Sequence, residues 1–98
     1  MSQNLKELNL KNISNQELKY DDRRYVGQVV NGLKEGKGIM YYNNGNRYEG
    51  DFKKGKREGK GIFYYNNGDR VMGDYFNDLP KGQFVMLTPN GEVKVNTY

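Results

Sequence analysis

The side chains best suited to chemistry in this sequence are five cations that fall within eight residues. They are Lys53, Lys54, Lys56, Arg57 and Lys60. Such a cluster is a candidate for binding acidic phospholipids such as phosphoinositides, because each cation near a membrane surface gains about 1 kcal/mol. A solvated loop is the alternative interpretation, since the equivalent stretches elsewhere in the chain mix acids with bases.

Catalytic chemistry has little support in the composition. The 98 residues include no cysteine and no histidine, which excludes thiolate nucleophiles, imidazole bases and zinc sites built from these ligands. The glycines lack the Gly-Lys-Ser/Thr ending of a phosphate-binding loop. The carboxylates Glu49, Asp51, Asp69 and Asp74 occupy strand and turn positions of a repeat, where charge serves solubility. We therefore predict a non-enzymatic protein without cofactor, metal, small-molecule substrate or nucleic-acid partner.

The overall composition bounds the size and location of the protein. Hydrophobic residues make up 35%, charged residues 29%, and the mean hydropathy is −1.04, which leaves room for one small domain. The net charge of +4 permits weak attraction to phosphates without requiring it. No run approaches the ~18 apolar residues of a membrane-spanning helix, and the amino terminus lacks a signal-peptide core. We therefore expect an intracellular, cytoplasmic protein.

An internal repeat with a period of 23 residues organises the chain from residue 25 onwards. Residues 25–47 and 48–70 are identical at fourteen of 23 positions, and residues 71–93 keep the pattern in part. All thirteen glycines lie at or after Gly27, so residues 1–24 are predicted to form an N-terminal arm or cap. Residues 94–98 take the place of the first strand of a further repeat, with Tyr98 at the position of Phe52.

Each repeat predicts a β-hairpin. In the second repeat, residues 48–53 and 60–65 have the alternation and aromatic content of strands, with a polar loop at 54–59. We expect Lys53 to pair with Lys60. That register places each strand glycine beneath an aromatic ring, which gives glycine a packing role inside a strand. The opposed pairs are then Phe52 with Gly61, Gly50 with Phe63, and Tyr48 with Tyr65.

The second connection of each repeat carries an Asn-Gly turn signal at Asn67 and Gly68. A two-residue turn there would place the aromatic side chains of successive hairpins on opposite faces. We therefore predict an odd-numbered loop, in which Gly68 follows a type I turn as a bulge in the left-handed region. Gly45 and Gly91 are expected to do the same.

These hairpins predict an all-β fold, a single-layer twisted antiparallel sheet of roughly six or seven strands. The pattern Tyr-x-Gly-x-Phe-x-x-Gly-x-x-x-Gly-x-Gly resembles the MORN (membrane occupation and recognition nexus) repeat, and the resemblance covers residues 25–93. It implies an interaction scaffold or a lipid-contacting module and no reaction. Phe84, at the position of Gly61, departs from the pattern. The matching residues are Tyr48, Gly50, Phe52, Gly55, Gly59 and Gly61.

Alternation along the strands divides the side chains between two faces. The predicted aromatic and glycine face carries Tyr25, Tyr42, Tyr48, Gly50, Phe52, Gly61, Phe63 and Tyr65. The opposite face, called the second face below, carries the partner-binding candidates Ile39, Tyr41, Ile62, Tyr64, Val85 and Leu87. Large apolar patches are uncommon on soluble monomers, so this face should be covered, either by a partner, by a second copy or by the N-terminal segment. That segment supplies Leu5, Leu8, Leu10, Ile13 and Leu18.

The functional prediction from sequence is a scaffold module that binds a protein partner or a second copy of itself. A cytoskeletal or ciliary component is the setting that the resemblance favours. The alternative function is a peripheral membrane module that binds acidic phospholipids through the five clustered cations. Open sheet edges near Tyr25 and near residues 93–98 favour self-association.

Overall fold

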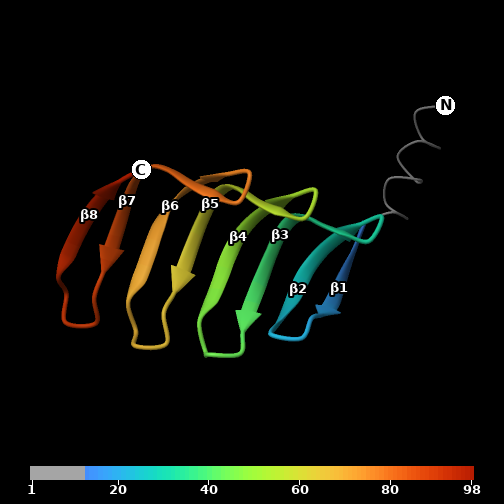
Figure 1. The fold of residues 1–98 in the computed structure, drawn as a ribbon, viewed down its shortest axis with the longest axis horizontal. Coiled ribbons are helices and arrows are strands. Elements are labelled where there is room, and N and C mark those ends of the chain that lie inside the picture. The colour runs from blue at the N-terminus through green and yellow to red at the C-terminus, as the bar shows by residue number, and fades with distance from the viewer. Residues whose placement is uncertain (1–12) are drawn as a thin grey trace.

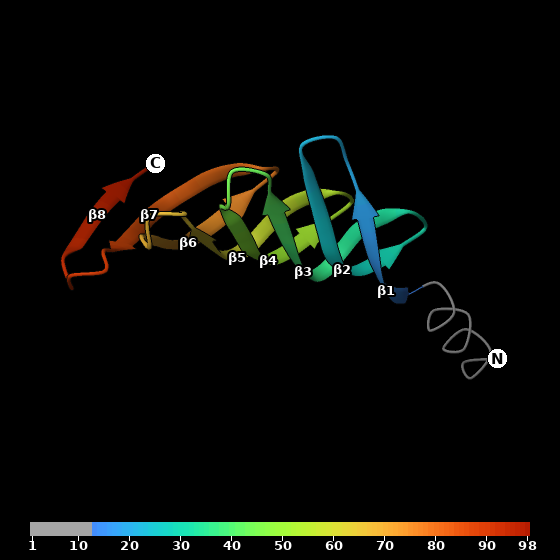
Figure 2. The same ribbon diagram turned by 90° about the horizontal axis from the view of Figure 1, so that it is seen from below.

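The computed structural model describes residues 13–98, which form one open sheet of eight antiparallel strands in chain order (Figure 1). Viewed at right angles to Figure 1, the sheet is curved along its length (Figure 2). The strands are β1 Ile13–Lys19, β2 Arg23–Val30, β3 Leu33–Tyr42, β4 Arg47–Lys53, β5 Lys56–Tyr64, β6 Arg70–Phe76, β7 Leu79–Leu87 and β8 Val93–Thr97.

The predicted all-β sheet is confirmed, with more strands than the six or seven expected. The additional strand is β1, which comes from the predicted N-terminal arm. It pairs with β2, so that Leu18 lies opposite Tyr25. The prediction of an open edge near Tyr25 is therefore wrong. The described part of the arm therefore extends the edge of the sheet and does not cross the second face. The expected contribution of Leu5, Leu8 and Leu10 falls outside the described residues.

The predicted register within a hairpin is wrong by two residues at the glycines and, beyond a bulge, by four residues at the turn. In β4 and β5, Gly50 pairs with Gly61 and Lys53 pairs with Lys56. The residues expected to form a polar loop, 54–59, are instead a two-residue turn and the beginning of β5. Lys54 and Gly55 have φ angles of 51° and 86°, which fits a type I′ turn whose twist matches the strands. A lysine at its first position is a weak signal for this turn, but the equivalent Asn31 and Gly32 of the first repeat, with φ angles of 51° and 77°, carry the Asn-Gly signal that sequence reasoning overlooked.

A row of paired glycines crosses five neighbouring strands. This glycine row consists of Gly27, Gly38, Gly50, Gly61 and Gly73. A Cβ added to Gly61 would lie 2.2 Å from the hydroxyl oxygen of Tyr48, and one added to Gly38 would lie as close to Tyr25. The expectation that aromatic rings cover the glycines is confirmed, but each ring leans over from a diagonal position.

The core of the protein, which also contains Val29 and Met40, is built around a line of aromatic rings on one face, which we call the spine and which ends at the exposed Tyr98. Successive rings meet edge to face, with centroids 5.1–5.3 Å apart and interplanar angles of 84–89°. Each such contact contributes about 0.5–1.5 kcal/mol beyond burial. The spine also confirms that Tyr98 packs as the counterpart of Phe52. Its members in order are Tyr25, Phe52, Tyr48, Tyr75, Phe84 and Tyr98.

The predicted odd-numbered loops are confirmed at the other end of the hairpins. The φ angles of Gly45, Gly68 and Gly91 are 93°, 98° and 91°. In the loop between β5 and β6, the Gly68 amide donates to the Tyr65 carbonyl at 3.0 Å. The Tyr65 amide in turn donates to the Asp69 carbonyl at 2.9 Å. This turn with a glycine bulge keeps the aromatic side chains of successive hairpins on one face.

In the third repeat, the aromatic ring that covers a strand glycine comes from the opposite strand of the hairpin. Tyr48 lies over Gly61, whereas the third repeat has Val71 at the first of these positions and Phe84 at the second. Phe84 is 3% exposed, and its ring lies 2.6 Å from the point where Gly73 would carry a Cβ. The ring therefore enters the core from β7 instead of β6. This exchange explains the departure of Phe84 from the repeat pattern.

This packing predicts that the protein tolerates Val71→Tyr and Phe84→Gly only when both changes are made together. We expect Phe84→Gly alone to lower the free energy of unfolding by about 3–5 kcal/mol, because it leaves a cavity. Val71→Tyr alone should also destabilise, because Phe84 already fills the space. The double variant recreates the tyrosine and glycine of the second repeat and should recover most of the loss in urea unfolding. A double variant as unstable as the sum of both changes would contradict this packing.

Candidate functional site

The six partner-binding candidates lie together on the second face, opposite the spine. Cross-strand pairing links Ile39 to Glu49, Glu49 to Ile62, and Met72 to Val85, so these side chains form one row across the sheet. All six candidates are half-buried. The other row, two residues further along the strands, contains Tyr41, Tyr64 and Leu87.

Arginines alternate with the tyrosines of that other row. Arg24 pairs with Tyr41 and Arg47 pairs with Tyr64, and the guanidinium carbons lie 4.2 and 3.9 Å from the ring centroids. Such contacts are worth about 0.5–1 kcal/mol at exposed sites. The tyrosines therefore present rings covered by guanidinium groups instead of bare apolar surface. Sequence reasoning missed these arginines, although one directly precedes the leading tyrosine of each of the first two repeats.

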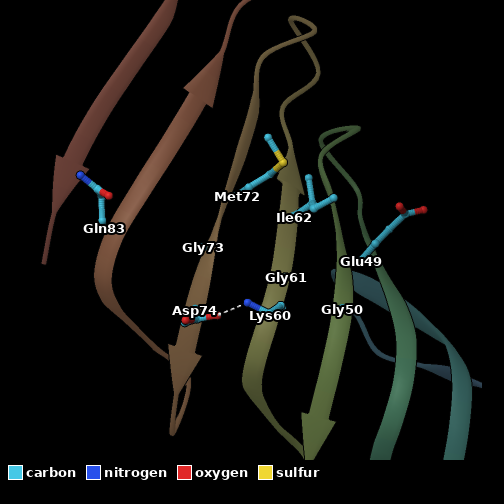
Figure 3. A pocket seen from close by; sticks show the side chains of 9 residues that line it. All are labelled: Glu49, Gly50, Lys60, Gly61, Ile62, Met72, Gly73, Asp74 and Gln83. Carbon is cyan, nitrogen blue, oxygen red and sulfur yellow. Dashed lines mark ion pairs between the residues drawn. The ribbon is translucent and has the colours of Figure 1, made fainter.

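A groove crosses the strands of the second face above the glycine row (Figure 3). Its larger part has a volume of about 580 Å³. Ile62 and Met72 line one side, and Lys60 and Asp74 line the other, with Nζ and Oδ1 3.9 Å apart. A neighbouring cavity of about 360 Å³ shares Glu49 with it and continues towards β2. The groove therefore offers an apolar wall facing a charged one.

The five clustered cations do not form one patch. Arg57 lies on the spine side of the sheet, whereas Lys60 lies on the second face. Lys56 Nζ donates to an asparagine side chain of the next hairpin turn at 3.0 Å. Lys53 and Lys54 are exposed at the tip of their hairpin. The five cations therefore cannot bind one lipid headgroup together, and Lys53 and Lys54 at the hairpin tip are the members of the cluster that lie side by side and exposed.

Arg57 is held over the spine by Asp78 of the next hairpin turn. Its backbone amide and its Nε donate to Asp78 Oδ1 at 2.8 and 3.1 Å, and Nη2 donates to the Asp78 carbonyl at 2.7 Å. The guanidinium carbon lies 4.6 Å from the ring centroid of Tyr75. Partial burial raises the pKa of Asp78, but the hydrogen bonds and charge of Arg57 outweigh it and lower that pKa below its ordinary 3.8.

Burial raises the pKa of the buried spine tyrosines Tyr25, Tyr48 and Tyr75 above its ordinary value of 10.0. Burial, with smaller effects of Tyr20 and Glu35, raises the pKa of Tyr25 to about 12. The Tyr25 hydroxyl donates to the Gln28 carbonyl at 2.8 Å. These groups therefore act in packing and hydrogen bonding. The remaining predicted members of this face lie at its margin: Tyr42 and Phe63 are half-buried and Tyr65 is exposed.

Within residues 13–98 the features suited to binding are the groove of the second face and the rows of side chains that flank it. No group of three acidic, histidine or cysteine side chains in this part of the chain could hold a metal ion. Over the same residues, no helix is long and apolar enough to cross a membrane. The groove and the rows that flank it are therefore the features to compare with known proteins.

A single sheet of stacked hairpins, with rings covering a glycine row, defines a β-hairpin repeat protein. The MORN repeat family model matches residues 25–47 and 48–70, which comprise the hairpins β2–β3 and β4–β5. The chain is a MORN repeat protein. A comparison with curated proteins gives no match. MORN repeats are generally non-catalytic modules that interact with proteins or with membrane lipids.

The contact between Arg57 and Asp78 predicts a pH-dependent contribution to stability. At pH 7 we expect Asp78→Asn to lower the free energy of unfolding by no more than about 1 kcal/mol, because the carboxylate is partly screened by water. Folding lowers the pKa of Asp78, so the native protein has this stabilisation above about pH 4 and loses it as the pH falls further. Urea unfolding should therefore show a smaller difference at about pH 2 than at pH 7.

The matched control for this measurement is Asp74→Asn. Asp74 is 60% exposed and lies 3.9 Å from Lys60, so its replacement should change the free energy of unfolding by less than about 0.5 kcal/mol. An Asp78→Asn difference that stays constant across this pH range would show that the charge of Asp78 does not stabilise the fold.

Proposed function

We propose that this protein is a non-catalytic scaffold module that binds a protein partner in the groove of the second face. The observation that carries the proposal is the groove of about 580 Å³, whose apolar wall is left open by the described residues 13–98. Ile62 and Met72 are already half-buried, so covering the rest of each side chain would gain about 1 kcal/mol, roughly half of the value for full burial. The family assignment supports an interaction module without indicating which face is used.

The width of the groove favours an extended partner segment. Its two walls are formed by residues such as Lys60 and Ile62, which are two positions apart on one strand. Two residues of a strand span about 6.8 Å, whereas a helix with its side chains is about 10 Å across. We therefore propose that the partner lays an extended segment across the strands. Apolar side chains would face Ile62 and Met72, and polar ones would face Lys60 and Asp74.

Lipid binding and self-association are two other candidate functions, and each is supported by fewer residues. Binding of acidic lipids would rest on Lys53 and Lys54, the exposed pair at the hairpin tip. Self-association would use the outer edges of β1 and β8, which lie at the two ends of the described sheet. A cytoplasmic location and a cytoskeletal or ciliary setting belong to the scaffold proposal and rest on the family resemblance.

The scaffold proposal predicts that partner binding fails when the apolar wall is removed. Ile62 and Met72 pair directly across β5 and β6, and the double variant Ile62→Thr, Met72→Thr keeps strand-compatible side chains there. We expect affinity-tagged protein with these changes to retain about tenfold less partner protein, or less still, because two apolar contacts are removed. Quantitative mass spectrometry of the retained proteins measures the loss.

The control is the double variant Leu33→Thr, Leu79→Thr, which changes exposed apolar side chains at hairpin tips, 48% and 67% exposed. It should retain the partners of the native protein, and thermal unfolding should show that both double variants are folded. Equal retention by the two variants would remove the groove from consideration. Loss of vesicle binding after neutralisation of Lys53 and Lys54, without any effect of the groove variant, would favour the lipid function.

A further inference from the structure

A separate cavity on the spine side of the sheet gathers cations from three strands. It has a volume of about 210 Å³, and Arg23 of β2, Lys34 of β3 and Arg57 of β5 line it together with the rings of Tyr42 and Phe52. Arg23 lies directly opposite Tyr42 in the sheet. Lys34 Nζ lies 5.9 Å from the ring centroid of Phe52. The cavity is therefore a pocket with aromatic sides and a positive rim.

The charges around this cavity are less balanced than those on the second face. There, Lys37 pairs with Asp51 at 2.6 Å and Arg47 pairs with Glu49 at 3.4 Å. In the cavity the acidic lining residue is Asp78, and Arg57 already occupies its carboxylate.

The other two cations of the cavity have little compensation. Arg23 contacts Asp22 at 3.2 Å, but the Asp22 side chain is 73% exposed and Asp22 does not line the cavity. Lys34 forms no ion pair with any residue of the described part of the chain. The residues that line the pocket therefore carry a net charge of +2, which Asp22 offsets in part from outside the cavity.

The next repeat provides an internal comparison. A cavity of about 200 Å³ recurs there, lined by Arg57, Tyr65 and Tyr75, which stand 23 residues after Lys34, Tyr42 and Phe52. The positions equivalent to Arg23 and Arg57 hold Asn46 and Pro80. The repeat thus explains why a cavity exists, but it does not explain why one cavity carries three cations and the other carries one.

The Tyr42 hydroxyl adds a donor to the charged cavity. Burial raises the pKa of Tyr42, the positive charges of Arg57 and Arg23 lower it, and the negative charges of Asp78 and Asp22 raise it by smaller amounts. The hydroxyl therefore lies in the field of both guanidinium groups and stays protonated at neutral pH. A protonated phenol between cations can donate to an anionic oxygen.

We propose that the cavity formed by Arg23, Lys34, Arg57 and Tyr42 binds a phosphoryl group. A phosphate monoester carries about −1.5 to −2 charges at pH 7, which matches the net charge of the lining residues better than a carboxylate does. Guanidinium groups are suited to phosphate oxygens because they donate two parallel hydrogen bonds. The cavity is smaller than the ~300 Å³ of typical ligand pockets, so it suits one anionic group of a larger or membrane-bound molecule. This site does not depend on the groove of the second face.

The test is a titration of the ¹⁵N-labelled protein with inorganic phosphate, followed by amide NMR shifts. We expect saturable shifts at Lys34, Tyr42 and Gly55, which line the cavity. The double variant Arg23→Gln, Lys34→Gln should weaken binding about tenfold for each cation removed. The variant Lys53→Gln, Lys54→Gln removes equal charge from the hairpin tip and should bind as the native protein does. Arg57 is left in place because its loss would also disturb the spine.

Vesicles of phosphatidylcholine with and without phosphatidylinositol phosphate distinguish the source of the phosphoryl group. Sedimentation with phosphatidylinositol phosphate that requires Arg23 and Lys34 identifies a lipid headgroup. Binding of inorganic phosphate without sedimentation identifies a soluble phosphate compound, and both results support the site. Equal weakening by the two double variants would show that general surface charge binds phosphate. Shifts that do not saturate, or that occur elsewhere, would likewise overturn the proposal.

Discussion

The structure depends on one packing arrangement, in which tyrosine rings lie flat on glycines of their own sheet. A sheet normally buries its apolar face against a second layer, and residues 13–98 supply none. Tyr25 and Tyr48 nevertheless have 0% exposure, because the glycine row leaves space where Cβ atoms would otherwise collide with the rings. Each strand glycine costs about 0.5–1 kcal/mol in conformational entropy. Ring burial and the edge-to-face contacts of the spine offset that cost.

The sequence was sufficient for the fold class, for the division into two faces and for the odd-numbered loops, and it was insufficient for the register. The predicted pairing of Lys53 with Lys60 differs from the observed one by an even number of residues, and such a shift leaves every side chain on its face. The faces were therefore right although the partners were wrong. The error came from the turn, because Lys54 adopts a positive φ of 51° that few residues other than glycine, asparagine or aspartate adopt. The Asn-Gly signal for this turn was present only in the first repeat, at Asn31 and Gly32.

The same register error explains what sequence reasoning missed on the second face. The expected pairing would have placed Tyr41 opposite Val26, so the tyrosine looked like a bare docking residue. In the structure Tyr41 lies opposite Arg24, and the guanidinium covers its ring. The candidate site thus changes from isolated tyrosines to a groove between Ile62 and Lys60 above the glycine row. The groove depends on the placement of side chains across several strands, which residue types and spacing alone do not determine.

The repeat determines where cavities form on the spine side, and substitutions within individual repeats determine which cavity is charged. Arg57 lies over the spine, held by Asp78, and the same guanidinium lines the charged cavity. Its position is therefore set before any anion arrives, so little rotamer freedom remains to be lost on binding. Lys53 and Lys54, exposed at a hairpin tip, would each lose up to about 2 kcal/mol of side-chain entropy when ordered against a ligand. An anion should therefore favour the cavity over the cluster that is more conspicuous in the sequence.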